Sequence, residues 1–165
     1  MNYSTTIFGL AAAILLASCG GSDNKKPPKS NTSPIATATS FTTQADTAYA
    51  GTLNGTDADN DKLTFDAGTA PANGTLTLNK NGTYSYLPNA EFTGSDKFTF
   101  KVSDAMSSSA PVDVTITVDL LEVTFSDYSR KAFKRAATDN PLPLNSRKVS
   151  QDVTAANAYD DLLMQ

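Results

Sequence analysis

Between residues 34 and 121, apolar side chains recur at every second position in short runs separated by Gly, Asn, Asp and Pro. The clearest apolar sets are Phe98, Phe100 and Val102, and Val112, Val114, Ile116 and Val118. Such alternation gives a strand one buried and one wet face. Shorter runs of the same kind lie around Phe41, at 47–53, at 63–65, at 76–78 and at 84–86. Seven strands in these 88 residues predict an all-β sandwich.

The turn between the segments 76–78 and 84–86 fixes how they pair. A two-residue turn would pair Leu78 with Ser85 and put the leucines and tyrosines on opposite faces of the hairpin. A three-residue loop with Gly82 in the left-handed conformation pairs Leu78 with Tyr84 instead. Because this register gives one amphipathic face, the sequence predicts the three-residue loop.

An apolar run from Ile7 to Leu16 stands near the N-terminus. Its ten residues are about half of the roughly 20 that a membrane-spanning helix needs. The run ends in Leu16-Ala17-Ser18-Cys19, the pattern of a bacterial lipobox, in which a peptidase cuts before a lipid-modified cysteine. We expect residues 1–18 to be a lipoprotein signal peptide and Cys19 to carry the lipid, with an ordinary signal peptide as the alternative. Gly20 resembles the sorting pattern for the outer membrane, so the expected location is the bacterial cell envelope.

Two segments flank the predicted sandwich. Residues 19–33 lack large apolar side chains apart from the predicted anchor and predict a flexible tether. Residues 122–165 predict a short tail that is partly helical or disordered, with helix-forming residues at 126–137 and a second helical pattern at 153–164. This tail could lie on a membrane, dock on the sandwich or be a remnant of a longer ancestor.

The composition excludes several kinds of chemistry. The chain has no His and a single Cys, so Ser-His and Cys-His nucleophile pairs and imidazole or thiolate metal sites are impossible. Its net charge of −4 argues against nucleic acid as a partner. An enzyme built on paired carboxylates stays open, but most Asp residues stand in turns, where backbone hydrogen bonding explains them. The sequence therefore predicts a protein that is not an enzyme.

Three motifs carry a family resemblance. They are Thr56-Asp57-Ala58-Asp59-Asn60-Asp61-Lys62-Leu63-Thr64-Phe65, Ala72-Asn73-Gly74-Thr75-Leu76-Thr77-Leu78, and the segment 82–98 followed by Val102-Ser103-Asp104. In order and spacing they resemble the bacterial cadherin-like, Ig-like repeats of surface proteins and adhesins. The resemblance implies a Greek-key sandwich, often associated with calcium, that serves as a spacer or adhesive module. Asn60 departs from the repeats, which commonly carry Gly there.

The alternating acidic residues Asp57, Asp59 and Asp61 suggest a metal site of oxygen ligands. Calcium takes six to eight oxygens, so three carboxylates are too few. If strands alternate in direction, the loop after Asp104 lies at the same pole of the sandwich, and Asp104 becomes a fourth candidate ligand. An acidic turn held by its own backbone amides is the alternative.

These observations predict a lipid-anchored envelope protein that displays a cadherin-like module for adhesion or contact with an unknown surface protein or glycan. A carbohydrate or small-ligand binding module is the alternative. Such a module needs exposed aromatic side chains on one face, whereas the sandwich core requires most of the six Tyr and eight Phe.

Overall fold

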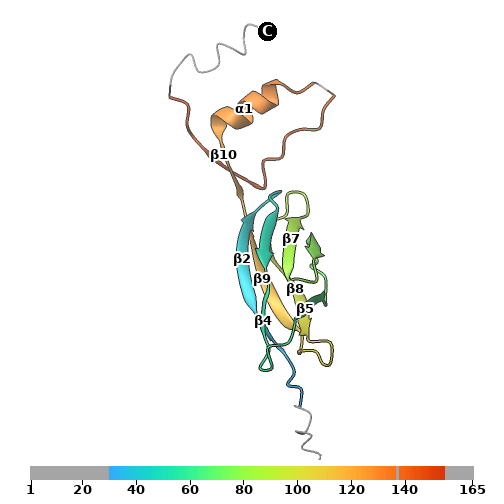
Figure 1. Cartoon of the computed structure of the whole chain (residues 1–165). Helices are drawn as coiled ribbons and strands as arrows, with labels where there is room; N and C mark the ends of the chain where they lie inside the picture. The colour runs from blue at the N-terminus through green and yellow to red at the C-terminus, as the bar shows by residue number, and fades with distance from the viewer. Residues whose placement is uncertain (1–29, 137, 155–165) are drawn as a thin grey trace, which may run out of the picture. The chain divides into compact units, whose positions relative to one another are not determined.

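The computed structural model describes residues 30–136 and 138–154 (Figure 1). Its elements in chain order are β1 (Ile35–Thr37), β2 (Thr39–Gln44), β3 (Tyr49–Thr52), β4 (Asn54–Thr56), β5 (Thr64–Ala67), β6 (Gly74–Leu78), β7 (Thr83–Pro88), β8 (Gly94–Ser103), β9 (Val112–Asp119), β10 (Leu121–Thr124), α1 (Phe125–Phe133) and β11 (Arg147–Ser150). The predicted all-β class is confirmed, and the described part of the tail contains one short helix.

Two sheets form the sandwich. One has the order β2-β9-β8-β5 and the other β3-β7-β6, so the seven predicted strands are the seven strands of these two sheets. β2 and β9 run parallel, and the other neighbours within the two sheets are antiparallel. A separate pair of short strands, β1 and β4, was not predicted.

The core lies between the two sheets and is built from the inward-facing residues of the alternating strands. Its fully buried members include Tyr86, Phe98, Phe100, Val102, Val114 and Ile116. Phe41 stacks on Tyr49 with 4.0 Å between ring centroids, and Tyr84 meets Phe98 edge to face at 5.7 Å. Along β8, Phe98, Phe100 and Val102 are buried while Lys97 and Lys101 are exposed, so the predicted inward face of this strand is confirmed.

The register of the β6–β7 hairpin is also confirmed. Leu78 pairs with Tyr84 and Leu76 with Tyr86. Gly82 has φ 88°, in the left-handed region that glycine tolerates without a steric penalty. A Cβ on Gly82 would come within 3.1 Å of the Phe65 ring, so close packing adds a second reason for glycine.

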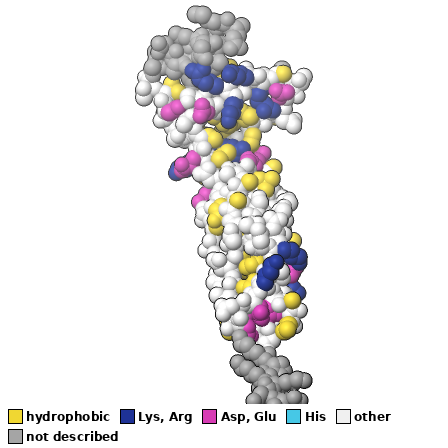
Figure 2. All heavy atoms as spheres, in the orientation of Figure 1, with side chains coloured by type: hydrophobic (Ala, Val, Ile, Leu, Met, Phe, Trp, Pro, Cys, Tyr) yellow, Lys and Arg dark blue, Asp and Glu magenta, His cyan; other side chains and the backbone are white. Residues whose placement is uncertain are grey.

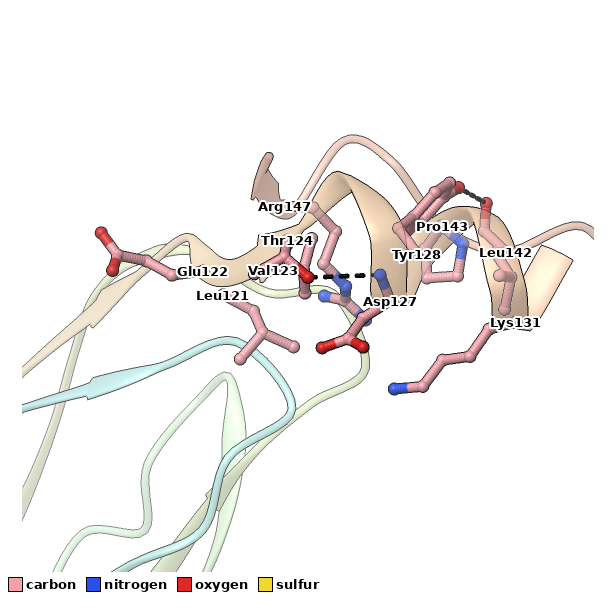
Figure 3. Close-up of a pocket in the computed structure, with 10 residues that line it drawn as sticks. All are labelled: Leu121, Glu122, Val123, Thr124, Asp127, Tyr128, Lys131, Leu142, Pro143 and Arg147. Atoms are coloured by element: carbon pink, nitrogen blue, oxygen red, sulfur yellow. Dashed lines mark hydrogen bonds between the residues drawn. The ribbon is translucent and has the colours of Figure 1, made fainter. Parts of the chain in front are cut away.

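The tail folds as a strand, a helix and a second strand. β10 and β11 pair in parallel, a pairing that the sequence pattern did not predict. α1 begins earlier and ends earlier than the predicted 126–137, and Thr124 caps it by accepting a hydrogen bond from the Asp127 amide (Figure 3). Most of the second predicted helix, 153–164, lies outside the described residues.

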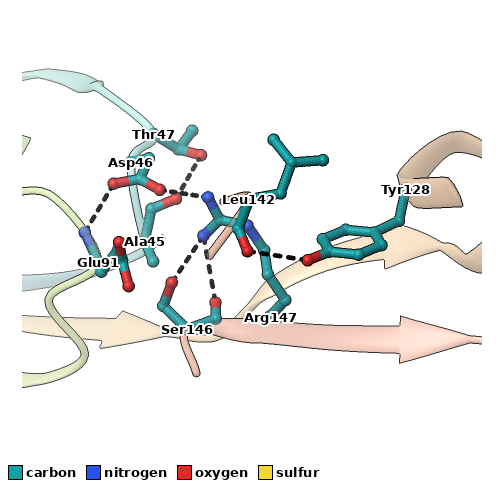
Figure 4. Close-up of polar contacts among 8 residues, drawn as sticks. All are labelled: Ala45, Asp46, Thr47, Glu91, Tyr128, Leu142, Ser146 and Arg147. Carbon is teal, nitrogen blue, oxygen red and sulfur yellow. Dashed lines mark hydrogen bonds and ion pairs between the residues drawn. The ribbon is translucent and has the colours of Figure 1, made fainter. Parts of the chain in front are cut away.

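A polar clasp joins the tail to the β2–β3 turn (Figure 4). Arg147 donates from Nη2 to the Asp46 carboxylate at 2.6 Å and from Nη1 to Ser146 Oγ at 2.8 Å. The other Asp46 oxygen accepts the Glu91 amide at 2.8 Å, and this bond, followed by Arg147, lowers the Asp46 pKa against the opposing effect of burial. The clasp and the bond from the Leu121 amide to the Ser146 carbonyl hold the start of β11 beside the sandwich.

Candidate metal centre

The acidic loop connects β4 to β5, and its first carboxylate organises it. Asp57 Oδ1 accepts the amides of Asp59 at 2.8 Å and of Asp61 at 3.2 Å, which folds the loop around that oxygen. Asn60 has φ 61°, a conformation that Asn adopts more readily than most residues. This explains why the sequence can carry Asn where the repeats that it resembles commonly carry Gly.

The three predicted carboxylates converge. One oxygen from each of Asp57, Asp59 and Asp61 lies within 4.8 Å of the others. Asp57 and Asp59 are half-buried and Asp61 is exposed, so the cluster stands at the surface with its first member turned inward. The arrangement offers hard oxygen ligands, the chemistry that Ca²⁺ prefers.

One atom of this cluster lacks the interaction that a buried polar atom normally has. Asp57 Oδ2 is buried and has no hydrogen-bond partner, the only such side-chain atom among the described residues. A buried carboxylate oxygen left in this way costs free energy, which a bound cation would recover. The donor set and this orphaned oxygen therefore fit a calcium ion.

The segment leading into β1 bridges the acidic loop and the loop after β8. The Thr32 amide donates to Asp59 Oδ2 at 2.6 Å, and the preceding residue, Asn31, donates from Nδ2 to Asp104 Oδ2 at 2.9 Å. Sequence reasoning placed both residues in the tether, because nothing in their polar surroundings distinguishes them from it. Only the fold shows that they reach the two loops.

Asp104 lies at this pole but stands outside the group of three carboxylates. Besides Asn31, its carboxylate accepts the amides of Met106 at 2.7 Å and Ser107 at 2.6 Å and the Ser107 hydroxyl at 2.9 Å. The bond from Asn31, followed by those from the loop, holds the Asp104 pKa well below its usual range. In this structure Asp104 organises its own loop and holds Asn31.

A second buried carboxylate, Asp96, was missed by sequence reasoning. It accepts the amides of Ala72, Asn73 and Lys97 at 2.8 to 3.0 Å and the Tyr86 hydroxyl at 3.0 Å. The signal was present, because the alternation of strand 94–103 places Asp96 on the inward face with Phe98. Its partners are hydrogen-bond donors, so this carboxylate ties β8 to β7 and to the segment before β6.

The predicted lipid site, Cys19, lies outside the described residues. Across 30–136 and 138–154, no helix has the length and apolar character needed to cross a membrane.

Several solved structures are similar to part of this chain. An endo-fucoidan hydrolase from glycoside hydrolase family 107 is 25% identical with a TM-score of 0.44, and the match covers 60% of this chain but 18% of the hydrolase. Human protocadherin-24 (EC1-2) is 22% identical with a TM-score of 0.45, and the match covers 58% of this chain and 52% of that one. The chain thus spans about a fifth of the hydrolase and about half of the protocadherin fragment. No curated protein matches the chain.

The match to a protein-family model shows which family this chain belongs to. The model described as bacterial cadherin-like domain matches residues 31–119, more than half of the 165 residues. The match begins at the residue that contacts Asp104 and ends with β9. It confirms the resemblance predicted from the acidic loop, the β6–β7 hairpin and β8. The chain belongs to the family of bacterial cadherin-like domains.

Proposed function

We propose that this protein is a non-catalytic contact module of the bacterial envelope, held there through a lipid on Cys19 and stabilised by Ca²⁺ at its acidic loop. The orphaned Asp57 Oδ2 beside two further carboxylates is the observation that carries the calcium part. Membership of the cadherin-like family supports the contact function.

Calcium would act on the segment that joins the tether to the sandwich. Bound Ca²⁺ would neutralise repulsion among three carboxylates, with Asp57, Asp59 and Asp61 as its protein ligands and water completing the shell. Asp59 also holds the Thr32 amide, so ordering this loop orders the start of the domain.

The test compares thermal unfolding of the full chain in Ca²⁺ and in EDTA. Binding at a hundredfold excess over the dissociation constant stabilises by about 2.7 kcal/mol, which raises the Tm of a domain this size by roughly 10 °C. Asp57→Asn keeps the Oδ1 acceptor for the two loop amides and replaces the orphaned oxygen by an amide NH₂, so it should abolish the calcium effect. Asp113→Asn is the matched control, because Asp113 is an exposed residue of β9 outside the cluster.

The calcium proposal fails if the unmutated chain unfolds at the same temperature in millimolar Ca²⁺ and in EDTA. It also fails if Asp57→Asn and Asp113→Asn respond equally to Ca²⁺, because the ion would then act on general surface charge. Equal stabilisation by Mg²⁺ would contradict a site selected by many flexible oxygen ligands.

Contact with a protein is favoured over carbohydrate binding by where the aromatic side chains lie. Among the described residues, the strongly exposed aromatic side chains are Phe125 and Phe133, both in α1, while the sandwich aromatics pack in or against the core. Sugar stacking would require aromatic faces on the sandwich surface. A glycan array that gives specific, saturable binding would overturn this choice, and capture of a defined envelope protein in Ca²⁺ but not in EDTA would support it.

The anchor is tested separately through Cys19, whose thiol is the only group in the chain that can form the thioether. Cys19→Ser should move the protein from the membrane fraction to the soluble fraction. Globomycin, which blocks the lipoprotein peptidase, should leave the unprocessed form. Unchanged processing in globomycin would contradict lipid anchoring without affecting the calcium proposal.

A further inference from the structure

The helix of the tail packs on the rest of the tail along one side. α1 has nine residues, none of them buried, and helices below about 12 to 15 residues are marginal in water unless another surface covers their apolar face. On the packed side α1 borders a cavity of about 430 Å³ that it shares with β10 and with residues such as Leu142 and Arg147 (Figure 3). There the Tyr128 hydroxyl donates to the Leu142 carbonyl at 3.0 Å.

Another side of α1 presents an apolar stripe at the surface. Helical spacing brings its residues together along a hollow lined by Phe125, Tyr128, Ser129, Ala132 and Phe133. Phe125 is 39% exposed and Phe133 is 69% exposed. Of the eight large hydrophobic side chains that are exposed among the described residues, five lie between positions 120 and 149. The exposed apolar surface is therefore concentrated in the tail.

The side of α1 opposite the stripe is basic. Arg130 and Lys131 stand about 60° round the helix beyond the two edges of the stripe, and Lys134, the C-cap, lies between them. Asp127 is an acidic residue on the same side, in the first turn. Figure 2 shows Lys and Arg gathered beside apolar side chains in this part of the molecule. An apolar face with Phe opposite a face rich in Lys and Arg is the pattern of a helix that lies in a membrane interface.

The charge of the tail is opposite to that of the sandwich. Residues 31–120 contain ten acidic and four basic side chains, whereas residues 121–154 contain six basic and four acidic ones. The excess of basic residues remains although Arg135 pairs with Asp139, because acidic partners are counted as well. An anionic surface therefore attracts the tail and repels the sandwich.

The size of the stripe favours a lipid surface over a protein partner. A nine-residue helix is about 13 Å long and about 10 Å wide. This face is a small part of the roughly 800 Å² that each partner buries in a stable protein complex. A second copy of the chain would also bring the same basic side chains against each other. A bilayer needs no matching surface of fixed shape, and its anionic headgroups attract Lys and Arg wherever they stand near the surface.

We propose that α1 binds the surface of an anionic phospholipid bilayer, with Phe125 and Phe133 inserted among the acyl chains and the basic side chains at the phosphate groups. The long Lys and Arg side chains reach the phosphates while their stems cover the helix. This contact is separate from the lipid on Cys19, because it holds the C-terminal part of the chain and depends on headgroup charge.

The fluorescence of a single tryptophan tests this contact, because the chain has no Trp of its own. Phe133→Trp puts the reporter on the stripe at an exposed position, where a larger ring needs no repacking. The full chain with this substitution is mixed with vesicles of phosphatidylcholine, with and without phosphatidylglycerol. Its emission should shift to shorter wavelength only where phosphatidylglycerol is present. Lipids brominated on the acyl chains should quench this emission, and high salt should weaken the shift.

Two further variants isolate the stripe and the charge. Leu87→Trp is the matched control, because it puts the same reporter at a 47% exposed position of β7, and its emission should not change. Lys131→Gln with Lys134→Gln in the Phe133→Trp chain should raise the phosphatidylglycerol fraction needed for half of the shift by about twofold or more. Because the emission reports α1 itself, the result does not depend on whether Cys19 carries a lipid.

Several results would overturn the proposal. One is equal emission of the Phe133→Trp chain in buffer and in both kinds of vesicle. An equal shift of the Leu87→Trp control would mean that the whole domain adsorbs, and a shift without quenching by brominated lipid would leave the stripe outside the acyl region. A shift without lipid that grows with protein concentration would assign the stripe to a second copy. An unchanged response after neutralising the two lysines would remove the role of headgroup charge.

Discussion

Removing the Asp96 carboxylate should be one of the most damaging polar changes in this protein. The side chain is 7% exposed and binds three backbone amides and the Tyr86 hydroxyl. In Asp96→Ala, water can reach the exposed Ala72, but the donors of Asn73 and Tyr86 lose their principal acceptor inside the protein. Each buried donor left unsatisfied costs about 1 to 3 kcal/mol, so the free energy of unfolding should fall by about 3 to 5 kcal/mol.

Two milder variants should lower the free energy of unfolding by smaller amounts. Asp96→Asn keeps one acceptor oxygen and should cost roughly 2 kcal/mol, and Tyr86→Phe removes a single donor and should cost about 1 kcal/mol. Asp113→Asn, an exposed change of the same chemistry, should stay within about 0.5 kcal/mol of the unmutated chain. Urea unfolding of the full chain at pH 7, followed by circular dichroism, measures all four variants.

The pH dependence supplies a second readout. Burial raises the Asp96 pKa, but the hydrogen bonds from Asn73, Lys97, Ala72 and Tyr86 outweigh burial and bring this pKa below its ordinary value. The carboxylate therefore stabilises the fold fully above the unfolded-state pKa and loses this contribution as pH falls through the lower folded-state pKa. The stability gap between the unmutated chain and Asp96→Asn should shrink below about pH 4. A loss under 1 kcal/mol for Asp96→Ala, or a gap that does not shrink in acid, would refute this reasoning.

Phe100→Ala should cost about 3 to 5 kcal/mol in urea unfolding, because Phe100 is fully buried against Phe65, and a loss below 1 kcal/mol would mean that the ring does not pack in the core. Gly74→Ala should cost roughly 1 to 3 kcal/mol in the same assay, since a Cβ there would lie 2.4 Å from a buried tyrosine ring and 2.7 Å from a backbone oxygen; unchanged stability would show that this contact relaxes freely. Asp46→Asn tolerates the local φ of 57° and keeps the bond to Glu91 but loses the ion pair with Arg147, so hydrogen exchange in β11 should accelerate while β8 is unaffected. Equal hydrogen exchange of β11 in Asp46→Asn and in the unmutated chain would show that the clasp does not stabilise the tail.

The sequence predicts the sandwich well because alternation is a local signal. β7, β8 and β9 each bury alternate residues along most of their length, and the β6–β7 register follows from parity and a single left-handed glycine. The pairing of β10 with β11 could not be predicted in the same way. Its strands are four residues long and Val123 meets Val149 across 26 positions, so no local pattern records the contact.

In the candidate site, too, the contacts between residues close in sequence could be predicted and those between distant residues could not. Asp57, Asp59 and Asp61 lie within five consecutive residues of one loop, and their spacing alone predicts convergence. Asp104 reaches the same pole from another strand, and its neighbours there depend on packing. The sequence predicted Asp104 as a fourth metal ligand, whereas in the structure its carboxylate accepts a hydrogen bond from Asn31, 73 residues away in sequence.

The parallel pairing of β2 with β9 decides how the domain responds to mechanical force. β2 follows the segment held at the acidic loop, β9 leads into the tail, and six residue pairs from Thr39–Val114 to Gln44–Asp119 join them. A pull that separates the N-terminal and C-terminal ends of the domain slides these strands past each other lengthwise. The evenly spaced hydrogen bonds of a parallel pair then share the load and must break together, whereas strands pulled apart from one end break them one at a time. The first and last strands of the sandwich thus form a shear-loaded joint between the N-terminal and C-terminal ends of the domain.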